Sequence, residues 1–325
     1  MQNALELRMG AGTRITLRQL ELFCAAADHG SFARAAEAMY VTSNAVSLAV
    51  GELEASLDAH LCVRHRARGI TLTPAGLQLR ERAGELLRDA NELQHSIGDS
   101  DGEGILRGPV AIGCYSTLAA TVLPSLMQGF EERHPEVDLS IVDGTMKDLL
   151  PRLRAGELDV IIAYRINMPG DISEALLYET SVHVLLPAAH PLAANESVSL
   201  DDLREDRLIL LDIPPSGDHT LDMLTRAGVQ PEIAHRTPNF ELVRSLVGRG
   251  FGYSLLIQKP SIDVSYEGRR VVAKPIFPEL SAEAAVIIWP RQMRLTDRAR
   301  ALVDFAVETV HIQQWRPAQQ ENLAE

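Results

Sequence analysis

The feature that most constrains this 325-residue chain is a run of three helix-like segments that leads directly into a basic turn. Apolar residues recur at helical spacing from Leu17 to Ala27, and Gly30 is suited to end that helix because glycine tolerates the left-handed conformation. Further helices are expected over 32–39 and from 43 to about 57. Hydroxyl side chains are positioned to cap these two helices at Ser31 and Thr42. The pattern predicts a helix-turn-helix, with a plain three-helix packing unit as the alternative.

Two short strands, expected over 61–64 and 70–72, flank the sequence His65-Arg66-Ala67-Arg68-Gly69. A basic hairpin that directly follows a helix-turn-helix is typical of a wing, whose arginines reach phosphates or the minor groove. In a helix-turn-helix the second helix of the motif enters the major groove, where serine and asparagine suit base edges. The candidate DNA-binding residues are Ser31, Arg34, Thr42, Ser43, Asn44, Ser47, Arg64, Arg66 and Arg68.

The charge of the chain is unevenly distributed. The formal net charge is −13, which by itself argues against nucleic acid. Residues 1–98, however, hold 10 arginines, no lysine and 11 acidic residues, so this part is nearly neutral. Five of its arginines gather in a short stretch, namely Arg64, Arg66, Arg68, Arg80 and Arg82. Since attraction to DNA depends on the charge of the binding face, this cluster favours a DNA partner despite the total charge.

Several sequence phrases carry a family resemblance. The N-terminal ones are residues 17–23 (LRQLELF), 30–36 (GSFARAA), 41–47, 52–54 and 72–76 (LTPAG), and they stay in register over about 60 residues. The C-terminal ones are 134–137 (HPEV), 156–160 (GELDV), 190–193 (HPLA) and 250–253 (GFGY). Together they resemble LysR-type transcriptional regulators. The chain departs from that pattern at Ser43-Asn44, Leu48 and Cys62.

Between the two parts, a heptad seam predicts a helix that pairs with another helix. Its positions are Leu79, Ala83, Leu86, Ala90, Leu93 and Ile97. A helix that packs on its own domain is the alternative. The resemblance implies that this linker helix pairs between subunits, that the protein is a homotetramer built as a dimer of dimers, and that double-stranded promoter DNA is its partner. RNA polymerase is a candidate further partner.

The C-terminal two-thirds alternates strand-like and helix-like segments, first over 109–164 and again over 182–257. Such alternation predicts an α/β domain with a mostly parallel sheet. The resemblance implies a bilobed effector-binding domain similar to type 2 periplasmic binding proteins. The overall fold class is therefore multidomain α/β, with an N-terminal winged helix-turn-helix, a long linker helix and this bilobed domain.

The expected domain boundaries follow from these patterns and the resemblance. They comprise a flexible extension (1–14), the winged helix-turn-helix (15–73), the linker helix (74–98), a hinge (99–107), the effector-binding domain (108–313) and a tail (314–325). Lobe one is expected to hold 108–180 and 278–313, and lobe two 181–277.

Ligands of open α/β sheets bind where strands lead into helices, and free N–H groups at helix N-termini attract anions. We therefore expect a small organic acid or related metabolite between the lobes. The candidate effector-binding residues are Cys114, Ser116, Thr117, Thr145, Tyr164, Arg165, Asp212, Ser216, Asn239 and Phe240. Each hydroxyl or amide has helix capping as its plainer role, and Arg165 has a surface or lobe-bridging role as an equal alternative. Cys114 at this position also raises thiol-redox sensing, with a structural cysteine favoured.

Other classes of protein lack support in the sequence. We find no nucleophile elbow, no phosphate-binding glycine loop and no metal-ligand spacing among the ten histidines and three cysteines, so neither an enzyme, a cofactor nor a metal is expected. No apolar run approaches the length of a membrane span. A solute-binding transport protein is disfavoured because no secretory signal is recognisable. The expected location is the cytoplasm.

Overall fold

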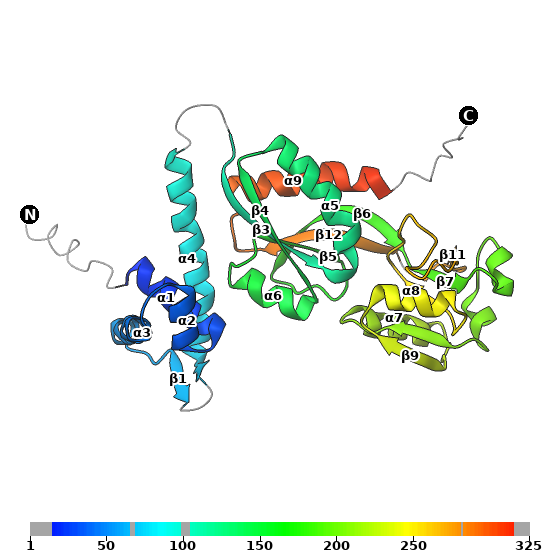
Figure 1. Cartoon of the computed structure of the whole chain (residues 1–325), viewed down its shortest axis with the longest axis horizontal. Coiled ribbons are helices and arrows are strands. Elements are labelled where there is room, and N and C mark those ends of the chain that lie inside the picture. Colours follow the sequence, from blue (N-terminus) through cyan, green and yellow to red (C-terminus); the bar gives the residue numbers. More distant parts are fainter. Residues whose placement is uncertain (1–14, 66–68, 99–104, 281, 315–325) are drawn as a thin grey trace, which may run out of the picture. The chain divides into compact units, whose positions relative to one another are not determined.

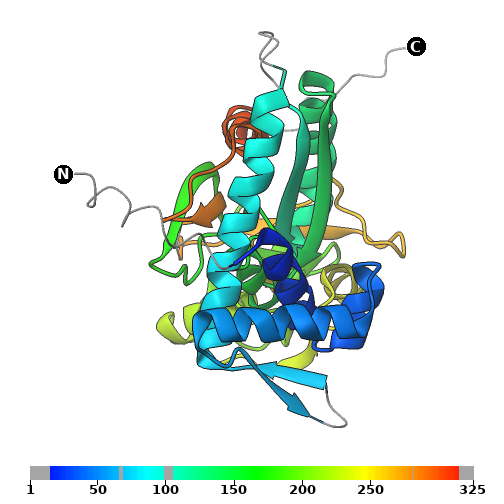
Figure 2. The same cartoon turned by 90° about the vertical axis from the view of Figure 1, so that its left-hand side faces the viewer.

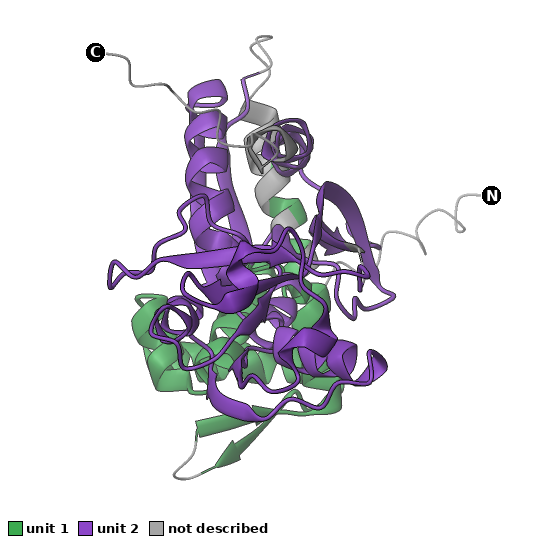
Figure 3. Cartoon of the chain, turned by 90° about the vertical axis from the view of Figure 1, so that its right-hand side faces the viewer, with its two compact units in different colours: residues 1–104, 154–157 green, residues 105–153, 158–325 purple. Residues whose placement is uncertain are grey.

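A computed structural model describes residues 15–65, 69–98, 105–280 and 282–314. The chain forms two compact units, one of residues 1–104 with 154–157 and one of residues 105–153 with 158–325 (Figure 1, Figure 3). The predicted flexible extension, most of the predicted hinge, the predicted tail beyond Gln314, and Arg66 and Arg68 lie outside the described residues.

The first unit contains the predicted three helices, α1 (Leu17–His29), α2 (Phe32–Ala38) and α3 (Ser43–Leu57). Gly30 ends α1 in the left-handed conformation, as predicted, and Thr42 caps α3 by accepting a hydrogen bond from the Ala45 amide at 3.2 Å. Ser31 stands at the N-cap of α2, but its hydroxyl makes no capping hydrogen bond, which corrects the role predicted for it. The helices pack around Phe23, Val46, Val50 and other buried apolar residues.

The hairpin follows as the antiparallel pair β1 (Cys62–His65) and β2 (Gly69–Leu72). Strand β1 lies one residue later than predicted, and β2 begins one residue earlier than predicted. Figure 2 shows it projecting from the end of the helical part of this unit. Gly69 has a φ of +80°, and a Cβ there would lie 2.1 Å from the Gly30 carbonyl oxygen. The neighbouring Ile70 amide donates to that same oxygen at 2.9 Å. Glycine at this position therefore lets the hairpin lie against the turn between α1 and α2.

The long helix α4 (Pro74–Gly98) begins as predicted, with the Thr73 hydroxyl accepting from the Gly76 amide at 3.1 Å. Its heptad seam divides into two parts. Leu79 and Ala83 pack into the core of their own unit, whereas Leu86 and Leu93 are 53% and 60% exposed. The Ile97 side chain lies outside the described residues. The first part of the seam thus has an intramolecular role, whereas Leu86 and Leu93 in the second part expose apolar side chains.

Lobe one of the second unit contains a five-stranded sheet in the order β4-β3-β5-β12-β6. The strands are β3 (Gly108–Tyr115), β4 (Val137–Gly144), β5 (Val160–Tyr164), β6 (Ile172–Ser181) and β12 (Ala282–Pro290). Helices α5 (Ser116–Arg133) and α9 (Asp297–Gln314) pack against each other over the sheet, and α6 (Met146–Arg154) completes the lobe (Figure 1). Strands β3, β4 and β5 are parallel, but β12 pairs antiparallel with β5 and β6. The mostly parallel sheet predicted for this half is therefore confirmed, because only β12 runs against the other four strands, whereas β6 was not predicted.

Lobe two has two small sheets, an antiparallel one in the order β10-β7-β11 and a parallel pair β8-β9. Their strands are β7 (His183–Pro187), β8 (Leu208–Leu211), β9 (Ile233–Thr237), β10 (Ser254–Leu256) and β11 (Val271–Pro275). Helices α7 (Ser216–Arg226) and α8 (Phe240–Gly248) and the short 3₁₀ helices η2 (Pro191–Ala194) and η3 (Leu200–Leu203) surround them. Helix α7 begins three residues earlier than predicted, directly after Pro215, which places Ser216 at its first turn.

Candidate functional sites

The outward face of α3 carries short polar side chains. Ser43 and Asn44 are exposed in its first turn, and Ser47 follows one turn later, half-buried. Burial of Val46 and Val50 on the opposite face fixes which side chains point outward. The polar residues predicted for this helix are therefore brought together on one face. Leu48, a departure from the family pattern, is 59% exposed and offers apolar surface next to them.

Arg64 connects the hairpin to this face. Its Nη1 donates to the Ser47 hydroxyl at 3.1 Å, and its guanidinium lies 4.9 Å from the centre of the Phe32 ring. A guanidinium over an aromatic face is held by cation–π attraction. Arg64 is thus an exposed cation with a defined position between α3 and the hairpin, while Arg34 on α2 is also exposed.

Arg80 does not belong to this surface, although the sequence placed it in the basic cluster. Its side chain is largely buried and forms two hydrogen bonds with the Asp28 carboxylate, Nε to Oδ1 at 2.9 Å and Nη2 to Oδ2 at 3.0 Å. A paired guanidinium of this kind fastens α4 to α1. The local sequence gave no sign of it, because Asp28 lies 52 residues away along the chain.

In the second unit, a small cavity lies where the two lobes meet, with a volume of about 20 Å³. Four predicted residues line it, namely Thr117, Tyr164, Ser216 and Phe240. The other lining residues are Val182, Leu211, Thr220, Met223 and residues 255–257. The cavity is thus mainly apolar, with hydroxyl groups as its polar component. Its size allows roughly a single water molecule.

Tyr115, which is not among the candidate effector-binding residues named from the sequence, joins the lobes beside this cavity. The Tyr115 hydroxyl donates to the Ile213 carbonyl at 3.1 Å and lies 2.9 Å from the Ser216 hydroxyl. The Tyr115 ring meets the Tyr164 ring edge-on, with centroids 6.1 Å apart. Tyr115 ends β3, so the strand-to-helix rule that selected Ser116 and Thr117 would also have selected it.

Two polar atoms near the cavity are buried without a hydrogen bond of good geometry among the described residues. One is the Tyr164 hydroxyl, next to Thr117, and burial raises its pKa well above the ordinary value. The other is Oε1 of Gln258, whose Nε2 donates to the Thr121 hydroxyl at 2.7 Å. Buried polar groups without partners are uncommon and carry a desolvation cost, so these atoms are candidates for ligand contacts.

Six predicted effector residues have other positions. Ser116 begins α5 without lining the cavity, the Thr145 hydroxyl donates to Asp148 at 2.6 Å, and Asn239 caps α8 by accepting from the Leu242 amide. Arg165 pairs with Glu174 at 2.8 Å, and Asp212 accepts from Arg236 at 3.5 Å. The Cys114 side chain is fully buried in the core of lobe one, and burial raises its thiol pKa well above the ordinary value. Such a cysteine disfavours redox sensing, since the thiolate is the reactive form.

Comparison with known proteins decides what these two units are. The model for the bacterial regulatory helix-turn-helix protein of the lysR family matches residues 17–77. The model for the LysR substrate binding domain matches residues 103–310. The chain belongs to the LysR family of transcriptional regulators. The LysR-type resemblance seen in the sequence is confirmed, as is the fold class of a helix-turn-helix domain followed by an α/β effector domain.

Relatives of this LysR-family chain are regulators rather than enzymes. The HTH-type transcriptional regulator TtuA of Agrobacterium vitis is 31% identical over 246 residues, which cover 74% of this chain and 79% of TtuA. The crystal structure of HinK, a LysR family transcriptional regulator from Pseudomonas aeruginosa, is 34% identical and has a TM-score of 0.61, covering 92% of this chain and 99% of HinK. The C-terminal domain of a probable LysR family regulator from Rhodococcus sp. RHA1 is 40% identical with a TM-score of 0.61, covering 62% of this chain and 99% of that domain.

The LysR-family chain is therefore a DNA-binding transcription regulator with an effector-binding domain. None of its described helices is long and apolar enough to cross a membrane. Within the described residues, no group of three or more His, Cys, Asp or Glu side chains is arranged to hold a metal ion.

Proposed function

We propose that this regulator is controlled by a small organic acid or related metabolite that binds between the two lobes of its effector domain. The observation that carries the proposal is the interlobe cavity, in which Thr117 and Ser216 stand in the first turns of α5 and α7. Two helix N-termini at one cavity favour an anionic ligand group. The apolar lining suits the carbon skeleton of the same molecule.

Entry of such a ligand requires the lobes to separate. The cavity of about 20 Å³ is far smaller than the roughly 300 Å³ or more of typical ligand pockets. Separation breaks the Tyr115 hydrogen bonds to Ile213 and Ser216. A ligand that replaces these contacts shifts the equilibrium between the closed and the open arrangement of the lobes. The size of this shift is set by the difference between the ligand's affinities for the two arrangements. We propose that this balance alters how subunits pack and hence the spacing of the DNA-reading units.

For DNA reading we propose the residues expected from the sequence, Ser31, Arg34, Thr42, Ser43, Asn44, Ser47, Arg64, Arg66 and Arg68. Exposure of Ser43 and Asn44 at the start of α3 supports contact with base edges. Leu48 is added as a contact for a thymine methyl group, because it lies exposed beside them. Arg64, held by Ser47 and Phe32, is proposed to contact phosphate.

We also propose a cytoplasmic homotetramer, built as a dimer of dimers, with RNA polymerase as a further partner. Leu86 and Leu93 support pairing through α4, since they repeat at seven residues and are exposed. The domain boundaries proposed from the sequence are kept, with a linker helix over 74–98, a hinge over 99–107 and an effector domain over 108–313.

A thermal-shift screen of organic acids, amino acids and aromatic metabolites against the full chain tests the effector site. A ligand at about 100 times its Kd stabilises the folded state by about 2.7 kcal/mol. We expect the stabilisation by a hit to fall strongly in a Thr117→Val/Ser216→Ala variant. Thr145→Ala is the matched control, because Thr145 begins a helix of the same lobe without lining the cavity. Equal stabilisation of wild type, the double variant and Thr145→Ala by the same compound would show that the ligand binds outside the interlobe cavity.

A further inference from the structure

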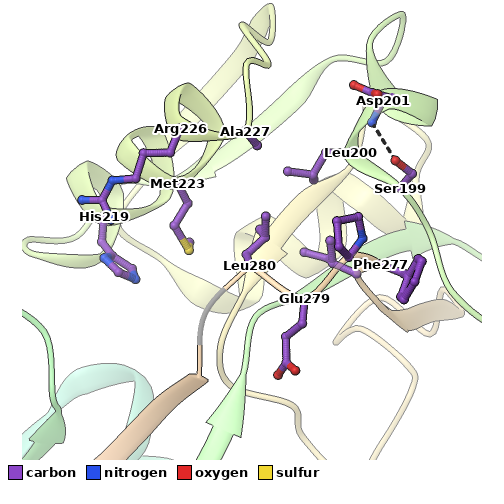
Figure 4. A pocket seen from close by; sticks show the side chains of 12 residues that line it. Ser199, Leu200, Asp201, His219, Met223, Arg226, Ala227, Phe277, Glu279 and Leu280 are labelled. Carbon is purple, nitrogen blue, oxygen red and sulfur yellow. Dashed lines mark hydrogen bonds between the residues drawn. The ribbon is translucent and has the colours of Figure 1, made fainter.

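Lobe two holds a second cavity, with a volume of about 370 Å³ (Figure 4). One wall is α7, with His219, Met223 and Arg226. The other wall consists of Leu200 on η3 and residues 276–280, the segment that leads from β11 toward β12. The volume falls within the roughly 300–1,000 Å³ of small-molecule pockets, in contrast to the interlobe cavity.

The centre of this cavity is apolar. Figure 4 shows Leu200, Met223 and Leu280 pointing into it from different elements. Leu200 and Met223 are each 5% exposed and belong to the core of lobe two, so the floor of the cavity is well ordered by packing. Such a surface favours a hydrocarbon or aromatic body, because apolar area leaves water on binding.

One side of the cavity carries cationic and hydrogen-bonding groups. Nε2 of His219 lies 2.8 Å from Oε1 of Glu283, whose side chain is 5% exposed. This contact fixes the imidazole ring and leaves Nδ1 without a hydrogen-bond partner among the described residues. Arg226 lies two turns further along α7 and forms no ion pair within the described part of the chain. Figure 4 shows both side chains on the same side of the helix.

The acidic residues at the rim do not cancel the charge of Arg226. Asp201 is paired with Arg204 at 2.8 Å, so its charge is already compensated. The Glu279 side chain points away from the centre of the cavity in Figure 4. A carboxylate is therefore the ligand group that matches the α7 side, since the Arg226 guanidinium can donate hydrogen bonds to it.

We propose that this cavity is a second small-molecule site, which binds a compact aromatic or branched apolar carboxylate. The apolar body lies between Leu200, Met223 and Leu280, and the carboxylate faces Arg226. Met223 also lines the interlobe cavity, and Ser216 at the start of α7 lines it too. A ligand here therefore contacts the helix that forms a wall of the interlobe cavity. The second site does not depend on the proposed interlobe site.

Isothermal titration of the full chain with phenylacetate tests the proposal, with phenylacetamide as the neutral analogue. We expect saturable binding of phenylacetate and at least threefold weaker binding of the amide. Ala227→Leu, at the exposed end of α7, fills the cavity from its rim and should weaken phenylacetate binding more than tenfold. Arg226→Gln should weaken it at least threefold. Arg249→Gln, an exposed arginine elsewhere in lobe two, should leave it unchanged.

The melting temperature of each variant is measured first, so that loss of binding is read only from folded protein. A ¹³C-methyl spectrum, with the Met223 signal assigned through Met223→Leu, gives a second readout and should shift in wild type but not in Ala227→Leu. Absence of saturable binding would overturn the proposal. Undiminished phenylacetate binding to Ala227→Leu would also overturn it. Phe240 lines the interlobe cavity but not the second cavity, so binding that is lost only in Phe240→Ala would overturn the proposal as well.

Discussion

Replacing Tyr115 with phenylalanine should destabilise the effector domain by about 1–3 kcal/mol, because it leaves buried polar partners without a donor. Tyr115 is 1% exposed, so water does not readily replace its hydroxyl. That hydroxyl bonds to the Ile213 carbonyl at 3.1 Å and lies 2.9 Å from the Ser216 hydroxyl, both in the other lobe. The ring itself stays in place, so packing against Tyr164 is retained and the hydrogen bonds alone are removed.

Urea unfolding of the full chain, followed by circular dichroism, measures this effect as a lower midpoint at unchanged slope. Tyr253→Phe is the matched control. Tyr253 is also 1% exposed, but its hydroxyl has no hydrogen-bond partner among the described residues. Removal of the Tyr253 hydroxyl should lower the free energy of unfolding by less than about 0.5 kcal/mol, or should increase it. A Tyr115→Phe variant no less stable than Tyr253→Phe would show that the Tyr115 hydrogen bonds do not stabilise the effector domain.

Three further predictions concern the wing, acid stability and thiol reactivity. Gly69 has a positive φ, and a Cβ there would lie 2.1 Å from the Gly30 carbonyl oxygen. Gly69→Ala should therefore displace the hairpin and weaken DNA binding measured by fluorescence anisotropy. An unchanged DNA affinity would argue against a role of the wing in DNA binding. Burial lowers the pKa of His183 from 6.5 to about 4, so the unfolded chain binds the proton at a higher pH than the folded chain does. The free energy of unfolding should therefore fall as the pH drops from about 6.5 to 4, by up to roughly 3 kcal/mol. Urea midpoints at pH 7 and 4.5 should therefore differ more for wild type than for His183→Asn, and equal differences would contradict this. Iodoacetamide should modify the half-buried Cys62 before the buried Cys114, as measured by mass spectrometry. Rapid labelling of Cys114 in folded protein would instead support a redox-sensing role for Cys114.

The first unit could be predicted in detail because its signals are local. Gly30 ends a helix, and Thr42 and Thr73 cap helices, through atoms only a few residues away. The same reasoning failed for Arg80, since its partner Asp28 lies on another helix. It also gave Ser31 a capping bond that its hydroxyl does not make. Local chemistry thus located the helices better than it located the side chains between them.

The candidate effector site was only half predictable, for a physical reason. Strand-to-helix junctions named Thr117 and Ser216 correctly as cavity residues, because topology brings such junctions to one edge of a sheet. Thr220 and Met223 lie deeper in α7 and reach the cavity through the placement of that helix against the other lobe. Strand β6 was missed because its burial pattern is irregular, in keeping with the register shift where β12 pairs with it.

The most direct test of the central claim is a titration of fluorescently labelled DNA, taken from upstream of the regulator's own gene, with the full chain at several salt concentrations. We expect saturable binding whose affinity falls steadily as salt rises, since counterions are released from phosphate. We also expect Arg64→Ala to weaken binding to all sequences, whereas Asn44→Ala should reduce the preference for this DNA over an unrelated duplex. Binding that is absent, or that ignores both salt and these substitutions, would contradict the assignment of α3 and the wing as the DNA-reading surface.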